Sequence, residues 1–285
     1  VYDHYTYCLC GDGCLEEGIS QEAISFAGLQ KLNKLILMYD CNDVTLDGPL
    51  SNSSVENTVG RFQSAGWNVI KVEDGNSVED IDKAITIAKQ SQEKPTMIMV
   101  HTVIGYGSAK QGTHKVHGSP LGIEDGEHAK KVYGYNYGPF EVPEEVYYTF
   151  RESFVKRGQE AYANFAKVWK DYKDENYDEA LKIESTVDND VSTLVYKDIP
   201  SYSEEFADST RNCSGACLNI LNKQVFNLIG GSADVAGSVM THIKDETDFT
   251  ATNRSGRNVN WGIREFAMAA MQNGMLLHGG LRTYV

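Results

Sequence analysis

The sequence predicts an α/β protein in which parallel sheets are flanked by helices. In the first third, short β-rich apolar runs alternate with helical segments, which is the pattern of β-α-β units. The strand candidates are nearly continuous apolar runs, as expected for strands that are covered on both faces. With 285 residues and 41% hydrophobic content, the chain is long enough for one large domain or two of ordinary size.

The individual elements follow from apolar periodicity and from breaker residues. We expect strands at 5–10, 35–39, 68–72 and 96–103, and helices at 20–32, 54–65 and 78–91. A glycine-rich loop, IGYGSAKQGTHKVHGSPLG, follows the last of these strands. It is too long for an ordinary connection, and this length indicates a functional loop.

The remainder of the chain is divided by composition. Residues 141–186 are charged, aromatic and helical, and a second α/β rhythm follows, with a helix at 209–222, a strand at 225–229 and a helix at 264–277. We therefore expect the C-terminal part of one α/β domain at 1–140, a helical connector at 141–205 and the N-terminal part of a second α/β domain at 206–285. The chain opens on Val1 and closes on LRTYV, which looks like the start of a strand, so we expect a piece of a longer protein.

Charge and cysteine usage exclude several classes of protein. A net charge of −14 and a pI near 4.9 disfavour binding to nucleic acid or to an acidic membrane surface, because the mean field repels polyanions. The six cysteines include no CxxC pair, which favours free thiols in the cytoplasm. No apolar window approaches the roughly 18 residues of a membrane span.

Two polar motifs lie at the carboxyl ends of the first two predicted strands. Asp12 stands in GDGCLEEG and Asn42 in YDCNDVTLDG, and in a parallel sheet ligands bind at that edge. A carboxylate, an amide oxygen and a loop carbonyl such as that of Val44 are oxygen ligands suited to Mg²⁺ or Ca²⁺. A bare GDG is more often a simple turn with a capping aspartate. Its pairing with Asn42, across one predicted helix and one predicted strand, favours the metal site.

These motifs resemble those of the thiamine-diphosphate enzymes, and the transketolase family in particular. The similarity lies in five ordered blocks, DHYTYCLCGDGCLEEGISQEA, YDCNDVTLDG, VIGYGSAKQGTHKVHGSPLG, GGSADV and WGIREFAMAAMQNGMLLHGG. The blocks span residues 3–280, which is nearly the whole chain. The resemblance implies a thiamine-diphosphate-binding fold, with 1–140 as part of the diphosphate- and metal-binding domain and 206–285 as part of the pyrimidine-binding domain.

The resemblance also implies roles for residues around the cofactor. Asp12, Asn42 and the carbonyl of Val44 match the ligands of the metal that holds the diphosphate, and Gly13 matches a contact to the diphosphate itself. His117 matches a histidine that contacts both cofactor and sugar, although a lone histidine is usually structural. Glu265 matches the glutamate that protonates the pyrimidine ring and so activates the cofactor. Asp234 falls near the cofactor.

Further residues match contacts to the substrate and to a second subunit. Arg211 and Ser238 fall where transketolases hold the phosphate of the sugar, although the sequence VAGS replaces the expected proline-containing turn. Glu17 matches a glutamate that faces its symmetry mate across a dimer interface. The resemblance thus implies a homodimer with active sites at the subunit interface.

The implied activity is the transfer of a two-carbon ketol unit from a ketose phosphate to an aldose phosphate, in the pentose phosphate pathway. Dihydroxyacetone synthase and deoxyxylulose-phosphate synthase share the cofactor signature and stay open as alternatives, as does a non-catalytic fragment with an incomplete site. We expect the 285-residue chain alone to be an incomplete catalyst.

Overall fold

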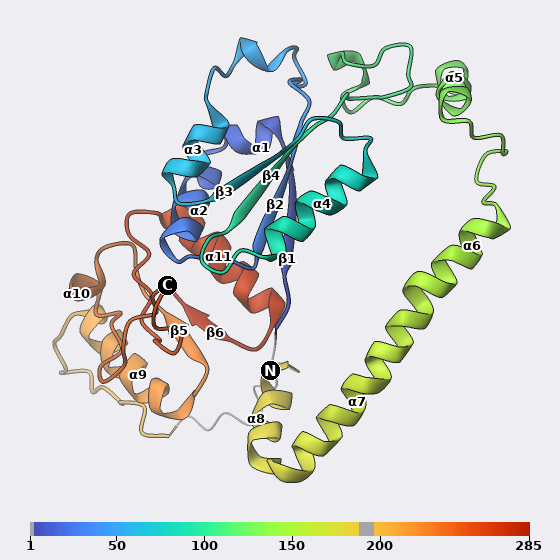
Figure 1. The fold of residues 1–285 in the computed structure, drawn as a ribbon. Helices are drawn as coiled ribbons and strands as arrows, with labels where there is room; N and C mark the ends of the chain where they lie inside the picture. The colour runs from blue at the N-terminus through green and yellow to red at the C-terminus, as the bar shows by residue number, and fades with distance from the viewer. Residues whose placement is uncertain (1–2, 188–196) are drawn as a thin grey trace. The chain divides into compact units, whose positions relative to one another are not determined.

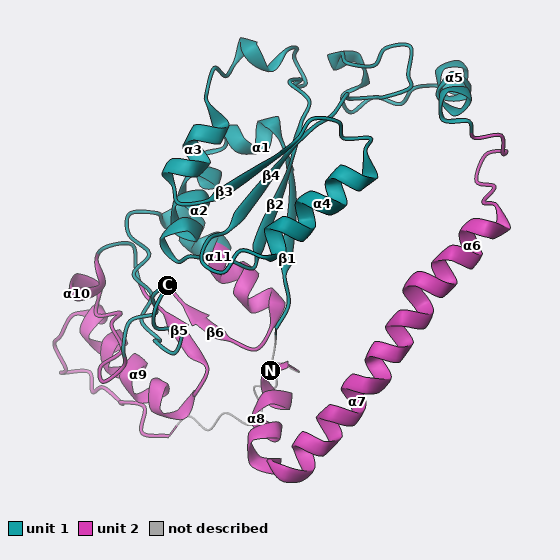
Figure 2. Cartoon of the chain, viewed as in Figure 1, with its two compact units in different colours: residues 1–134, 232–234, 247–270 teal, residues 135–231, 235–246, 271–285 magenta. Residues whose placement is uncertain are grey.

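The computed structural model describes residues 3–187 and 197–285 (Figure 1). The chain divides into two compact units (Figure 2). Unit 1 comprises residues 1–134, 232–234 and 247–270, and unit 2 comprises residues 135–231, 235–246 and 271–285. Residues 188–196 of the predicted connector lie outside the described residues.

Unit 1 is built on a four-stranded parallel sheet. Its strands are β1 (Thr6–Gly11), β2 (Leu35–Cys41), β3 (Asn68–Val72) and β4 (Thr96–His101), in the order β1-β2-β4-β3. Gly11 pairs with Asp40, and Asp40 pairs in turn with Val100. Because all four strands run in the same direction, their carboxyl ends meet at one edge, as the sequence predicts.

Helices cover both faces of this sheet (Figure 1). The helices are α1 (Asp12–Glu16), α2 (Gly18–Leu29), α3 (Thr58–Ser64) and α4 (Val78–Lys89). One apolar cluster joins Leu15, Ile24 and Phe62 to Leu37 and Tyr39 of β2. On the other face, Ile36 packs with Ala84 and Ala88 of α4. The alternation along β2 follows from the two-residue period of a strand.

Strand β1 differs from the prediction that the strands are buried on both faces. Its Tyr7 and Leu9 side chains are 49% and 75% exposed. Strand β1 lies at the end of the described sheet and pairs with β2 alone, and its Tyr7 and Leu9 side chains are left uncovered by the described residues. The apolar composition of β1 therefore indicates that its faces are covered, whereas the described residues do not cover them.

The predicted elements are otherwise present, with shifted ends. Residues 12–16 form the short helix α1, for which no element was predicted, and β5 begins at Leu228 rather than at Val225. Val225 instead donates its N–H to the Leu221 carbonyl at 2.8 Å and so closes the preceding helix.

The remaining elements comprise helices, two further strands and short 3₁₀ turns. The 3₁₀ turns are η1 (Leu50–Asn52) and η2 (His114–Val116). The helices up to the gap are α5 (Ile123–Tyr133), α6 (Glu144–Phe150), a π-helical stretch (Arg151–Lys156), α7 (Arg157–Glu175) and α8 (Tyr177–Val187). After it come α9 (Thr210–Gln224), β5 (Leu228–Gly230), α10 (Ala236–Val239), α11 (Glu265–His278) and β6 (Arg282–Tyr284), with β5 and β6 parallel. Among the described residues, no helix is both long and apolar enough to cross a membrane.

Candidate cofactor and metal site

Asp12 lies at the carboxyl edge of the sheet, where β1 ends and α1 begins. Gly11 is the last residue of β1, and Asp12 is the first of α1. Leu15, one turn further along α1, packs into the apolar cluster beneath the sheet edge and anchors this turn. Asp12 is consequently 5% exposed, although it carries a carboxylate.

Neutral donors surround the Asp12 carboxylate. The hydroxyl of Tyr39 donates to Oδ1. The backbone N–H groups of Asn42 and Asp43 donate to Oδ2 at 3.2 and 3.1 Å. In the part of the chain that the structure describes, no lysine, arginine or histidine forms an ion pair with Asp12. A buried carboxylate held only by neutral groups is well suited to a cation.

The loop after β2 supplies two of those donors because of its backbone shape. Asp43 has a φ of 61°, in the left-handed region that aspartate tolerates better than most residues. The side-chain oxygen of Asn42 accepts the Val44 N–H at 3.1 Å, and its Nδ2 donates to Asp40 at 3.3 Å. Asp40 in turn accepts a hydrogen bond from the Thr102 hydroxyl, beyond the end of β4. The loop is therefore held by side chains from β2 and from the segment after β4.

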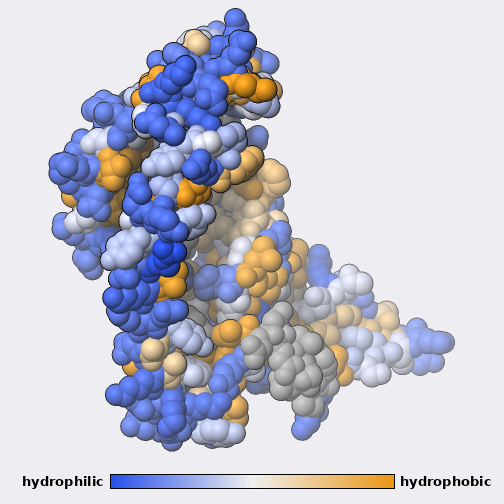
Figure 3. Space-filling model, turned by 90° about the vertical axis from the view of Figure 1, so that its right-hand side faces the viewer, coloured by the Kyte–Doolittle hydropathy of each residue, from blue (hydrophilic) through white to orange (hydrophobic). Residues whose placement is uncertain are grey.

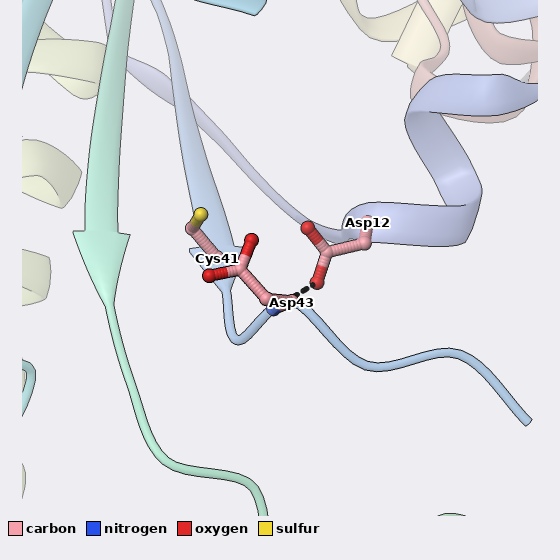
Figure 4. A group of neighbouring side chains, drawn as sticks. All are labelled: Asp12, Cys41 and Asp43. Atoms are coloured by element: carbon pink, nitrogen blue, oxygen red, sulfur yellow. Dashed lines mark hydrogen bonds between the residues drawn. The ribbon is translucent and has the colours of Figure 1, made fainter. Parts of the chain in front are cut away.

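A second carboxylate and a thiol lie beside Asp12 (Figure 4). Ligand atoms of Asp12, Cys41 and Asp43 all lie within 4.8 Å of one another. Burial raises the pKa of the Cys41 thiol, and sulfur is a poor ligand for the hard cations Mg²⁺ and Ca²⁺. The oxygen atoms of Asp12, Asn42, Asp43 and the Val44 carbonyl are the hard ligands of this edge. The residues present therefore fit a divalent cation such as Mg²⁺ or Ca²⁺.

Nearby hydroxyl and thiol groups are also held in their neutral forms. Burial, followed by the hydrogen bond to Asp12, raises the pKa of Tyr39 well above its ordinary value. Burial raises the pKa of Cys10 to about 12. Tyr39 thus acts as a hydrogen-bond donor at neutral pH, and neither residue offers a charged nucleophile.

His117 lies at the end of the short turn η2 in the glycine-rich loop. Its ring atom Nδ1 is buried and has no hydrogen-bond partner among the described residues. Buried polar atoms without partners are rare in proteins and are often completed by a ligand or water. The carboxylate of Asp125 ties the same loop down, because it accepts hydrogen bonds from the Ser108 hydroxyl at 2.5 Å and from the Ala109 N–H at 2.7 Å.

Glu265 begins α11, and its side chain is exposed. The start of this helix is fixed by α2, because Glu22 accepts the Ala267 N–H at 2.8 Å and Arg264 donates to the Ser25 hydroxyl at 2.9 Å. No hydrogen bond or ion pair within the described ranges links Glu265 to Asp12 or Asn42. The structure thus places Glu265 at a rigid helix start, apart from the hydrogen-bond network of Asp12.

The other predicted site residues are exposed. Arg211 lies in the first turn of α9 and Ser238 in α10. A cavity of about 420 Å³ is lined by residues of both helices and of the segment after α10, among them Asn212, Gly215, Gly237 and Lys244. Asp234 has a φ of 63° in the turn after β5. Gly13 and Glu17, at the two ends of α1, are also exposed.

The structure thus brings together the predicted ligands Asp12, Asn42 and Val44, and it adds residues that the sequence analysis missed. These are Tyr39, Asp40, Cys41, Asp43 and Thr102. The signal for four of them was present, because YDCND gives polar or reactive side chains around Asn42 at the end of a buried strand. Thr102 carried no signal of this kind, since its role depends on the pairing of β2 with β4.

Comparison with known families gives two matches that together span most of the chain. Residues 1–192 match the sequence model for the transketolase thiamine diphosphate binding domain, and residues 207–285 match that for the transketolase pyrimidine binding domain.

Individual relatives agree with these matches. The chain is 46% identical to a probable transketolase of Streptococcus pneumoniae and to a transketolase of Bacillus subtilis, and it spans 43% of the length of each. The solved transketolase from Leishmania mexicana superposes over 99% of the chain with a TM-score of 0.94 and 37% identity, and 42% of that protein is covered. A transketolase from Pichia stipitis in complex with sedoheptulose-7-phosphate gives a TM-score of 0.92 at 35% identity, over 97% of this chain and 42% of that one. These names favour neither dihydroxyacetone synthase nor deoxyxylulose-phosphate synthase.

Proposed function

The chain belongs to the transketolase family, and we propose that the protein to which it contributes transfers a two-carbon ketol unit from a ketose phosphate to an aldose phosphate. The reported relatives and solved structures carry the name of this enzyme, and one structure holds a seven-carbon sugar phosphate. The observation that supports the proposal most directly is the buried Asp12 carboxylate among oxygen-rich loop residues at the sheet edge.

Asp12, Asn42 and the Val44 carbonyl would hold a divalent cation, Mg²⁺ or Ca²⁺, and the cation would hold the diphosphate of thiamine diphosphate. Gly13 is exposed at the start of α1, so its backbone is open to the diphosphate. Thiamine diphosphate supplies the electron sink that carbon–carbon bond cleavage requires. The cation would also offset the negative charge of the chain, whose mean field repels anions.

The remaining site residues would act on protons and on the sugar phosphate. Glu265 would exchange a proton with the pyrimidine ring of the cofactor, and its exposure leaves it accessible for that contact. His117 would contact cofactor and sugar, and its buried Nδ1 would gain a hydrogen-bond partner in the loaded enzyme. Arg211 and Ser238 would hold the phosphate of the sugar, and Asp234 would lie near the cofactor.

We also propose a homodimer with the active site between the subunits. Glu17 would then face its counterpart in the partner, where two close carboxylates share a proton. Apolar side chains beside Glu265 are consistent with such a contact, because Ile263 and Phe266 are 74% and 65% exposed. Figure 3 shows that hydrophobic residues reach the surface in separate patches on the face it draws.

The proposed domain organisation is 1–140 for the diphosphate side, 141–205 for the connector and 206–285 for the pyrimidine side. The proposed compartment is the cytoplasm, since a reducing environment maintains free thiols and all six cysteines are unpaired.

The test of this proposal is cofactor binding by the purified chain. Isothermal titration calorimetry with thiamine diphosphate, at saturating Mg²⁺, should give saturable binding in the wild type. Asp12→Ala should abolish that binding, because it removes the buried carboxylate that faces the loop after β2. Asp47→Ala is the matched control, since it removes an exposed carboxylate from the same loop.

Absence of Mg²⁺-dependent binding in the wild type would contradict a cofactor site in this chain. Equal loss of binding in Asp12→Ala and Asp47→Ala would point instead to a general effect of charge. Turnover is then measured in the full-length protein, with a ketose phosphate donor and an aldose phosphate acceptor.

A further inference from the structure

We propose that Tyr39 is a positioning residue, whose hydroxyl holds the Asp12 carboxylate in the orientation that binds the divalent cation. The inference rests on the proposed function, because it concerns the cation site assigned above to Asp12, Asn42 and Val44. It adds a residue from β2 that acts through Asp12.

The first argument is the pattern of hydrogen bonds on the two carboxylate oxygens. A carboxylate oxygen has two acceptor positions. The backbone N–H groups of Asn42 and Asp43 occupy both positions of Oδ2. The Tyr39 hydroxyl occupies one position of Oδ1, and no other residue in the described ranges donates a hydrogen bond to that oxygen. Oδ1 is therefore the oxygen with room for a cation, and Tyr39 is the group that fixes it.

The second argument is the rigidity of Tyr39. Its side chain is 3% exposed and packs in the apolar cluster with Leu15, Phe62 and Met97. A ring held on all sides presents its hydroxyl from one direction only. Gly11 and Gly13 flank Asp12 and offer no side chains, so the orientation of its carboxylate depends on the hydrogen bonds that it accepts.

The third argument is that the hydrogen-bond donors to Asp12 come from different parts of the fold. The two N–H groups come from the loop after β2, whose Asn42 and Val44 would themselves be ligands of the cation. Tyr39 lies within β2, where ladder hydrogen bonds to β1 and β4 fix the backbone on both sides. Outer groups of this kind orient metal ligands and tune their affinity, and their loss typically costs about 10- to 100-fold in metal binding.

The test is a titration of Mn²⁺, as a spectroscopic substitute for Mg²⁺, followed by the electron paramagnetic resonance signal of the free ion. The titration uses the 285-residue chain at saturating thiamine diphosphate. Tyr39→Phe keeps the ring and removes the hydroxyl, and we expect it to weaken Mn²⁺ binding by about 10-fold or more. Tyr5→Phe is the matched control. Tyr5 lies just before β1, and its hydroxyl donates to the Lys89 carbonyl at 2.8 Å rather than to Asp12. Mn²⁺ binding by this variant should therefore stay at the wild-type level.

The melting temperature of each variant without metal and cofactor is the second readout. Tyr39→Phe should lose Mn²⁺ affinity at a temperature where the metal-free variant is still fully folded. If Mn²⁺ binding by the folded Tyr39→Phe chain stays within about twofold of the wild type, the positioning role of Tyr39 is wrong while the cation site stands. If the wild type binds no Mn²⁺, the proposed function fails, and the role of Tyr39 fails with it.

A buried substitution can also lower stability enough to prevent a titration. In that case both chains are titrated in the same concentration of trimethylamine oxide, which favours the compact state. Selective loss of Mn²⁺ affinity by the variant under these conditions supports the positioning role. Equal affinity of the two folded chains overturns it.

Discussion

Asp12 and Glu265 are two acidic residues of the proposed site, and their side chains have opposite surroundings. Asp12 is buried and accepts three hydrogen bonds from Tyr39, Asn42 and Asp43. Glu265 is exposed at the first turn of α11, beside the exposed side chains of Ile263 and Phe266. The surroundings of Asp12 are thus supplied by this chain, whereas those of Glu265 are open.

This difference indicates which function each carboxylate can perform with the groups that this chain supplies. Asp12 is oriented before any ligand arrives, so it is suited to hold a cation. Glu265 is positioned by the residues around it in the chain, because Ala267 donates its N–H to Glu22 and Arg264 donates to the Trp261 carbonyl. A proton-transfer role requires further groups around its side chain, and a partner subunit is the proposed source.

The largest expected effect comes from placing substitutions of Asp12 and Glu265 on different subunits of the full-length protein. Asp12→Ala and Glu265→Ala should each remove almost all turnover. Mixed subunits should regain activity, because a heterodimer of the two would contain one intact site and one doubly damaged site. Turnover of mixtures refolded together, compared with each variant alone, measures the effect.

If heterodimers form and no activity returns, Asp12 and Glu265 do not serve different active sites. Native mass spectrometry of the mixture provides the control for heterodimer formation.

An intermediate effect is expected from Glu22, which holds the start of α11. Its carboxylate accepts the N–H of the buried Ala267, so Glu22→Ala should lower the free energy of unfolding by about 1–2 kcal/mol. Urea unfolding of the chain, followed by circular dichroism, measures the change. Glu22→Gln keeps an acceptor and should cost less. A larger loss for Gln than for Ala would show that this hydrogen bond does not anchor the helix.

The smallest expected effect concerns the loop that carries His117. Hydrogen bonds from Ser108, and then from the Ala109 N–H, hold the pKa of Asp125 below its ordinary value. A carboxyl with a lowered folded-state pKa contributes stability above its unfolded value, and that contribution is lost as the pH falls below about 4. Exchange protection of the Ala109 amide should therefore decline in that acid range.

The Asp125→Asn variant supplies the comparison for this loop. It should show weak protection of the Ala109 amide that changes little with acidity in the same range. Protection that is equal in both chains at neutral pH would mean that Asp125 does not hold the loop.

The sequence was sufficient to predict the parallel sheet and one part of the site. The runs LILMY and NVIKV are apolar enough to identify strands, and NVIKV was placed with its observed ends. Asp12 and Asn42 could be predicted to meet because the carboxyl ends of adjacent parallel strands share an edge. This inference needs only strand order and direction, which short-range patterns constrain well.

Other features depend on long-range packing that a single sequence does not reveal. The hydrogen bond from Tyr39 to Asp12 joins residues 27 positions apart, and that from Thr102 to Asp40 joins residues 62 positions apart. The left-handed backbone at Asp43 and Asp234 also carries no strong signal, since aspartate occurs in many other conformations. The exposure of Leu9 was predicted wrongly, because an apolar run does not say whether both of its faces are covered.

The register of β1 on β2 has a consequence for how this chain acquires its structure. Gly11 lies opposite Asp40, so Asp12 can meet the loop after β2 only when two strands separated by a helical crossover have paired. Pairing of this kind is slow, because a long loop must close before any contact compensates for its entropy. Ligand capture at Asp12 would therefore be a late event in folding, and its onset would report that β1 has paired with β2. A bound cation would in turn favour the assembled sheet by mass action, so the amount of folded chain would depend on the concentration of the free cation.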